Sequence, residues 1–72
     1  IAIESFLGGK WRHGVGNRYV WSKYDHNNKI HKTTVQGASG QFSYSGLTSS
    51  GSRAEASWEK VLGGNRAWAD VK

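Results

Sequence analysis

The chain has 72 residues, no cysteine, nine aromatic side chains among its Trp, Tyr and Phe, and a formal net charge of +5 at pH 7. This length fits a single domain, and the lack of cysteine excludes disulfide bonds and thiolate metal ligands. No apolar run approaches the roughly 20 residues that a membrane-spanning helix requires, and the sequence shows no signal peptide, which could have been removed.

A chain this short must build its core from large side chains. Each aromatic ring can bury about 150–250 Å², so we expect the aromatic residues, and the four tryptophans above all, to form the framework of the fold. Residues 1–8 are expected to be a flexible N-terminal arm or a leader remnant, and residues 9–72 to form one domain.

Short aromatic and β-branched runs alternate with the turn signals "HGVGN", "DHNNK", "QGASG", "SGLTSSGS" and "GGN". This spacing is typical of an all-β sandwich or barrel. Residues 18–24 place Tyr19 and Trp21 on one face of a strand and Val20 and Tyr24 on the other, which predicts a strand covered on both sides. "DHNNK" is then a plausible hairpin tip, because asparagine tolerates positive φ.

The later strands follow the same logic. Residues 29–36 are β-branched and of mixed polarity, and residues 41–48 alternate so that Phe42 and Tyr44 share a face. Residues 53–62 allow two readings. Ser52 and Glu55 form a capping-box pattern that narrowly favours a helix, whereas a strand would direct alternate residues inward.

The histidines and carboxylates predict little chemistry of their own. His13, His26 and His31 show no spacing typical of a zinc site, and we expect no metal and no other cofactor. No pair of acidic residues resembles an acid–base couple, and no serine lies in a G-x-S-x-G elbow. We therefore expect a protein that is not an enzyme, in which Gly14 and Gly16 shape a turn through positive φ, a bulge or a close backbone approach.

The charge is concentrated in one third of the chain. Residues 10–32 hold six cations and one carboxylate, which account for the whole net charge of +5. Such a segment favours an anionic partner. Cations interleaved with aromatic residues suit both single-stranded nucleic acid and a membrane interface. The lack of a ribonucleoprotein-type motif disfavours nucleic acid as the partner.

Two motifs in order resemble the lactococcin 972 family of bacteriocins. The first is G-x-W-x-H-G-x-G at residues 9–16, and the second is S-x-Y-x-H-x-x-x-x-H-x-x-T-V at residues 22–35. "SRAEASWEKV" and "NRAWA" extend the resemblance to about Ala69. It implies a small antiparallel β-sandwich of two three-stranded sheets, with residues 53–62 as a strand.

The resemblance also implies a secreted antibacterial protein that is active against Gram-positive bacteria. Its target would be an anionic cell-envelope component such as lipid II, bound without pore formation so that septal cell-wall synthesis is blocked. Contact with a membrane surface and formation of a homodimer are both compatible with this expectation. The alternative function is that of a non-lytic cell-wall or glycan-binding module. Charge and motif position together select a set of expected target-binding residues: Lys10, Trp11, Arg12, His13, Arg18, Lys23, His26, Lys29, His31 and Lys32.

Overall fold

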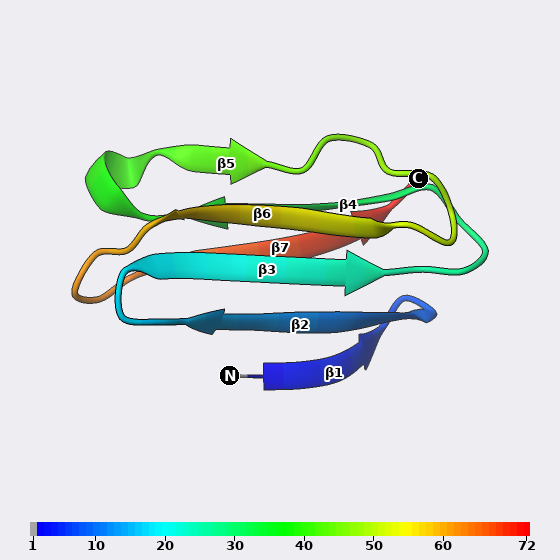
Figure 1. The fold of residues 1–72 in the computed structure, drawn as a ribbon, viewed down its shortest axis with the longest axis horizontal. Coiled ribbons are helices and arrows are strands. Elements are labelled where there is room, and N and C mark those ends of the chain that lie inside the picture. Colours follow the sequence, from blue (N-terminus) through cyan, green and yellow to red (C-terminus); the bar gives the residue numbers. More distant parts are fainter. Residues whose placement is uncertain (1) are drawn as a thin grey trace.

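The computed structural model describes residues 2–72 and consists of two antiparallel sheets (Figure 1). Sheet A has the order β1-β2-β3-β6, and sheet B has the order β5-β4-β7. Sheet A contains β1 (Ala2–Phe6), β2 (Gly9–Val15), β3 (Tyr19–Asp25) and β6 (Arg53–Glu59). Sheet B contains β4 (His31–Gln36), β5 (Phe42–Tyr44) and β7 (Arg66–Val71), and a short 3-10 turn spans Ala38–Gly40.

The predicted β-sandwich is confirmed, but sheet A has four strands where three were expected. The additional strand is β1, which falls in the segment expected to be a flexible arm. It pairs with β2 from Ala2 opposite His13 to Phe6 opposite Gly9. The two-residue turn between them has φ of 51° at Leu7 and 85° at Gly8. Positive φ at both positions suits a tight hairpin. Leucine is an unusual residue in such a turn, so the turn was not predicted from the residue types.

The segment "DHNNK" connects the two sheets and is not a hairpin tip, because β3 lies in sheet A and β4 in sheet B. The loop folds around the ring of His26. Its Nδ1 accepts the backbone N–H groups of Asn28 at 3.1 Å and Lys29 at 3.0 Å. Since Nδ1 is an acceptor, Nε2 carries the proton and donates to the Leu7 carbonyl at 3.0 Å. One imidazole thus joins the β1–β2 turn to the connection between the sheets.

Residues 53–59 form strand β6, which settles the choice between helix and strand. β6 pairs with β3 along its whole length, from Tyr19 opposite Glu59 to Asp25 opposite Arg53. Ala54 and Ala56 are buried beneath the second sheet. The gain from pairing and burial therefore outweighs the local capping-box signal, as tertiary context often does for weak propensities.

The core is small and almost half of its buried residues are polar, so the expectation of an aromatic framework is wrong for several rings. Buried apolar residues are Val20, Tyr24, Val35, Ala54 and Ala56, and they share the interior with Ser22, His26, His31 and Thr33. Five aromatic side chains that were expected inside are exposed: Tyr19, Phe42 at 45%, Tyr44 at 69%, Trp58 at 39% and Trp68 at 40%. Strand β3 is likewise covered on one face only, because Tyr19 is 48% exposed.

Hydrogen bonds hold this polar interior together. Trp11 Nε1 donates to Ser22 Oγ at 2.7 Å, and Thr33 Oγ1 donates to the Trp68 carbonyl at 2.6 Å. Because the Thr33 proton is used in that bond, Ser22 must donate to Thr33 Oγ1. We call this series, Trp11 to Ser22 to Thr33 to the Trp68 carbonyl, the hydroxyl chain. It crosses from β2 and β3 to β4 and β7, and within residues 2–72 no buried side-chain N or O atom lacks a partner.

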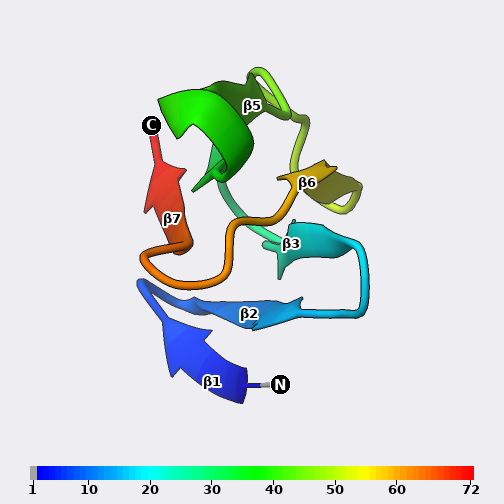
Figure 2. The ribbon, with the colours of Figure 1, turned by 90° about the vertical axis from the view of Figure 1, so that its left-hand side faces the viewer.

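Sheet B packs mainly on β3 and β6, and the β1–β2 hairpin extends beyond it (Figure 2). The inner face of this hairpin is therefore only half-covered. Close backbone packing also constrains the hairpin at Gly9, where a Cβ atom would lie 2.5 Å from the Asp25 carbonyl oxygen. The glycine that opens the first motif is thus required by the approach of β3. Gly16 does close the exit turn, because its N–H donates to the Tyr19 carbonyl at 2.8 Å, but neither Gly14 nor Gly16 has positive φ.

Candidate functional site

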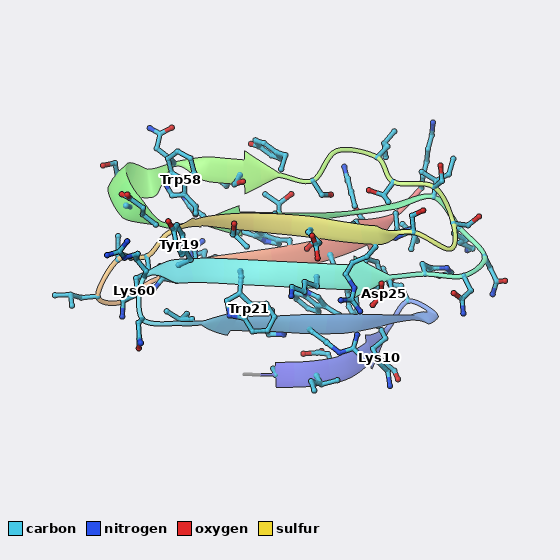
Figure 3. All side chains as sticks on the ribbon, viewed as in Figure 1. Lys10, Tyr19, Trp21, Asp25, Trp58 and Lys60 are labelled. Carbon is cyan, nitrogen blue, oxygen red and sulfur yellow. The ribbon has the colours of Figure 1, made fainter. Side chains whose placement is uncertain are left out.

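Three of the predicted target-binding residues share the outer face of sheet A. Lys10, Arg12 and Lys23 lie on neighbouring strands, with Lys10 opposite Asp25 and Arg12 opposite Lys23. Alternation along β3 places Trp21 on the same face. We call Lys10, Arg12, Lys23 and Trp21 the cationic patch. Figure 3 shows Trp21 between β3 and β2, with Lys10 towards the end of the sheet that carries Asp25.

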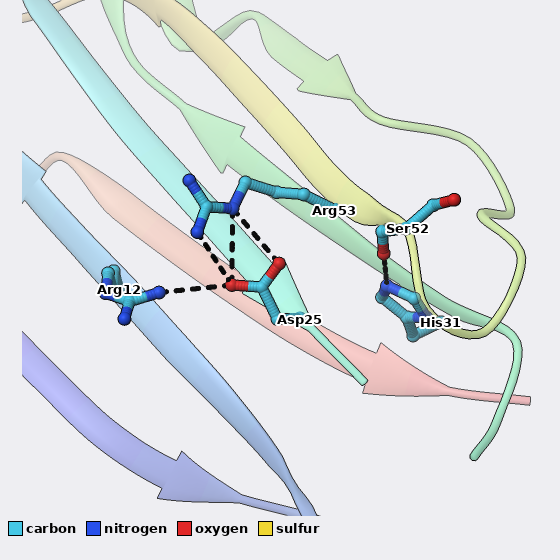
Figure 4. A network of polar contacts seen from close by, with 5 residues as sticks. All are labelled: Arg12, Asp25, His31, Ser52 and Arg53. Carbon is cyan, nitrogen blue, oxygen red and sulfur yellow. Dashed lines mark hydrogen bonds and ion pairs between the residues drawn. The ribbon is translucent and has the colours of Figure 1, made fainter. Parts of the chain in front are cut away.

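A carboxylate fixes one cation of the patch. Asp25 Oδ2 accepts Arg12 Nη1 at 3.1 Å, and the Asp25 carboxylate also accepts Arg53 Nε at 3.0 Å (Figure 4). The hydrogen bond from Arg53 is the main cause that lowers the pKa of Asp25 from 3.8, although partial burial opposes it. Asp25 is therefore an anion at neutral pH, and it holds two guanidinium groups in a fixed orientation.

The remaining two lysines of the patch each stand opposite an acidic residue, Lys10 opposite Asp25 and Lys23 opposite Glu55. Within residues 2–72, neither Lys10 nor Lys23 takes part in an ion pair. The Lys23 ammonium lies over the Trp21 ring, 5.7 Å from its centroid, which is cation–π distance. Lys23 also stands directly opposite Arg12, and like charges in that arrangement destabilise a sheet.

Trp11 and His13 belong to the other face of the same hairpin. Their rings lie 4.1 Å apart between centroids, and His13 Nε2 is 3.0 Å from Glu4 Oε2. Trp11 also begins the hydroxyl chain. Both side chains are half-buried, and they lie on the opposite side of sheet A from the cationic patch.

His26 and His31 lie inside the protein, at 4% and 0% exposure, and therefore contribute to the fold and offer no contact surface. His31 Nδ1 lies 2.9 Å from the Lys29 carbonyl oxygen, and its Nε2 lies 2.7 Å from that of Ser52 (Figure 4). Its ring also packs edge-on against Tyr24, with 5.5 Å between the centroids. The two motif histidines thus tie loops to the core.

The other predicted cations lie in separate places. Arg18 is in the β2–β3 connection, Lys29 is in the connection between the sheets, and Lys32 is on the outer face of sheet B. A charged segment that is continuous in sequence is thus divided between two sheets. Lys10, Arg12 and Lys23 are the only members of the predicted set that the described part of the chain brings together on one exposed face.

A second surface was missed by the sequence interpretation. The outer face of sheet B carries the exposed rings of Phe42, Tyr44 and Trp68, and they line a hollow of about 300 Å³. The alternation of residues 41–48 correctly placed Phe42 and Tyr44 on one face. That face points to solvent because Ser43, between the two rings on β5, faces sheet A. The alternation showed that the two rings share a face, but because aromatic side chains were expected in the core, that face was not predicted to be exposed.

Among residues 2–72, no group of three or more histidines and carboxylates is arranged to hold a metal ion. No helix in the same residues is long and apolar enough to cross a membrane. The two candidate binding surfaces are the outer faces of the two sheets. A ligand would contact cations on sheet A and aromatic rings on sheet B.

Comparison with known proteins gives one result. The family model Lactococcin_972, described as Bacteriocin (Lactococcin_972), matches residues 7–68, which is nearly the whole chain. Searches of curated proteins and of solved structures found no match. A bacteriocin family favours a non-enzymatic protein. The matched residues include both motifs, the buried histidines and the hydroxyl-chain residues Trp11, Ser22, Thr33 and Trp68. This chain therefore belongs to the lactococcin 972 family of bacteriocins.

Proposed function

We propose that this bacteriocin-like antibacterial protein is secreted and binds lipid II, the membrane-anchored cell-wall precursor of Gram-positive bacteria, through the cationic patch. The pyrophosphate of lipid II meets the cations of the patch, and the bound protein blocks septal cell-wall synthesis without forming a pore. Family membership supports the antibacterial part of this proposal. The choice of target rests on the chemistry of the patch.

The pairing of Arg12 with Lys23 is the observation that carries the proposal. Two cations directly opposite each other on an exposed face repel and reduce the stability of the sheet. A bound anion removes that repulsion and accepts charge-assisted hydrogen bonds from both side chains. Asp25 and Glu55 stand next to the pair and offset part of this repulsion in the free protein, and a phosphate-bearing ligand removes the remainder.

The surroundings of the pair suit a target at a membrane surface. Asp25 holds the Arg12 guanidinium in place, so less conformational entropy is lost when an anion binds. Trp21 lies beside the cations on the same face. Tryptophan next to Lys and Arg is typical of proteins that contact lipid headgroups. A membrane-anchored pyrophosphate provides both features at once.

The test is binding of the purified chain to anionic vesicles with and without lipid II, at near-physiological salt. The variant Lys10→Gln/Lys23→Gln removes two patch cations and should weaken binding to lipid II vesicles about 30-fold, at about 1 kcal/mol for each lysine. Lys60→Gln/Lys72→Gln carries the same change in net charge away from the patch, and it serves as the matched control with little expected loss. Near-native unfolding midpoints would show that both variants fold.

Two outcomes contradict the proposal at different points. Equal binding to vesicles with and without lipid II would remove lipid II as the target and leave general attraction to an anionic surface. Equal loss for both double variants would show that total charge, and not the patch, determines binding. Dye release from vesicles on addition of the protein would contradict the absence of a pore.

A further inference from the structure

The hollow on sheet B is built from three strands. Thr34 of β4 forms its floor and pairs directly with Tyr44 of β5 on one side and with Trp68 of β7 on the other. Neighbouring strands lie about 4.8 Å apart, so the Tyr44 and Trp68 backbones stand roughly 9.5 Å from each other. A small side chain between two large ones leaves the hollow open above β4 as a slot, and Tyr44 and Trp68 both line it.

The aromatic rings form a nearly continuous platform. Phe42 and Tyr44 are stacked at 6.0 Å with 17° between their planes, and Phe42 lies 5.8 Å from Trp68 at 32°. The hollow of about 300 Å³ is at the lower end of the range for ligand pockets. The rings therefore present faces of similar orientation to one open site.

Stability does not explain this exposure. Tyr44, the most exposed of the three at 69%, adds nothing to the apolar core, which consists of Val20, Val35 and Ala56 with Ala67 packed against them. A protein this small would gain more from burying its aromatic residues than from displaying them. Clustered exposed apolar side chains on a monomer commonly mark a binding surface.

The polar groups at the rim indicate which ligand fits. Lys32 and Asp70 pair in register beside the aromatic slot, and both line the hollow. Together they supply an ammonium donor and a carboxylate acceptor with no net charge, and within residues 2–72 neither joins an ion pair. A neutral, hydroxyl-rich ligand with an apolar ring face complements this combination. The C–H groups of such a ring carry partial positive charge and are attracted to the negative faces of aromatic rings.

We propose that the outer face of sheet B is a carbohydrate-binding site, in which a neutral pyranoside stacks between Tyr44 and Trp68 and forms hydrogen bonds with Lys32 and Asp70. This site goes beyond the proposed function, because it lies on the opposite sheet from the cationic patch and requires none of the patch residues. Only the choice of sugar rests on that function: N-acetylated hexosamines are the sugars of the bacterial cell wall.

The experiment is a titration of the ¹⁵N-labelled chain with a β-1,4-linked N-acetylglucosamine tetramer, followed by amide chemical shifts. Shifts confined to β5, β7 and the middle of β4 are expected. Tyr44→Ala and Trp68→Ala should each weaken binding about five- to tenfold through the lost stacking. Tyr44→Ala should fold normally, because the side chain is mostly exposed. Trp21→Ala is the matched control on sheet A and should leave the affinity for the sugar unchanged.

Every other outcome overturns the proposal. No shift at millimolar sugar, or shifts that persist in Tyr44→Ala and Trp68→Ala, would exclude this site for sugars. Sedimentation that shows a dimer lost in Tyr44→Ala, without sugar binding, would assign the surface to a second copy of the chain. Vesicle binding lost in Tyr44→Ala, without sugar binding, would assign it to lipid. The Lys10→Gln/Lys23→Gln variant should still bind the tetramer, so failure of the lipid II proposal can be told apart from failure of this one.

Discussion

The hydroxyl chain predicts that one buried oxygen atom is worth a large share of the stability of this protein. In Ser22→Ala, Trp11 Nε1 loses its acceptor and Thr33 loses the bond it receives. Each net hydrogen bond contributes about 1 kcal/mol. Because Ser22 is fully buried, no water replaces its oxygen. We therefore expect the free energy of unfolding to fall by about 2 kcal/mol, from a total of roughly 4–11 kcal/mol for a domain of this length.

Urea denaturation followed by tryptophan fluorescence measures this loss. With a slope near 1 kcal/mol per M, as expected for a small protein, the midpoint should fall by roughly 2 M. The melting temperature should fall by roughly 10 °C. Ser57→Ala is the matched control, since Ser57 is an exposed serine of β6, and its free energy of unfolding should change by less than about 0.5 kcal/mol.

A double-mutant cycle tests whether the bonds act as a chain. Thr33→Val breaks the bond to Ser22 as well as the bond to the Trp68 carbonyl, so the losses in Ser22→Ala and Thr33→Val overlap. The double variant should therefore be about 1 kcal/mol more stable than the sum of the single losses predicts. Additive losses, or a Ser22→Ala variant as stable as Ser57→Ala, would refute the reasoning.

Two further predictions concern the backbone and the ion pairs. Gly9→Ala should destabilise the fold by about 1–3 kcal/mol, because its Cβ would lie 2.5 Å from the Asp25 carbonyl oxygen, whereas Gly63→Ala meets nothing within 4 Å and should be neutral in the same urea assay. The pKa of Asp25 is lowered from 3.8, first by the Arg53 hydrogen bond, so its carboxylate stabilises the fold above that pH and this contribution disappears as the pH falls through the lower folded-state pKa. The stability difference between the wild type and Asp25→Asn should shrink below pH 3.8; a difference that stays constant down to about pH 2 would contradict the role of the carboxylate.

The sequence predicted strand character well because period-two alternation is a local property. The alternation predicted that Tyr19 and Trp21 lie on one face of their strand and Val20 and Tyr24 on the other, and that Phe42 and Tyr44 share a face. The structure confirms both predictions. Alternation does not state which face is buried. That depends on which sheet covers the strand, and here the serine face of β5 points inward. The sequence therefore predicted which aromatic residues share a face, but it did not predict that this face is exposed to solvent.

The predicted contact surface was only partly recoverable for a related reason. Residues 10–32 form a single run of charge in sequence, but β4 turns away into the other sheet at residue 31. Successive residues of each strand also point to opposite faces. Lys10, Arg12 and Lys23 meet only because the β2–β3 register sets Arg12 opposite Lys23. That register depends on the lengths of turns such as the one at residues 16–18, which charge and motif position do not specify.

The polar interior also determines how stability should vary with temperature. Unfolding exposes less new hydrocarbon than in a typical domain, because Tyr24 is the only buried ring among the Trp, Tyr and Phe residues of the described chain, while Phe42, Tyr44 and Trp68 are already in contact with water. The heat-capacity increment of unfolding should therefore lie below the roughly 0.9–1.1 kcal/mol/K typical of a chain this long. A smaller increment flattens the stability curve, so cooling should weaken this protein less than one with an apolar core. A polar core thereby gives a small, disulfide-free protein a wide temperature range in which to remain folded.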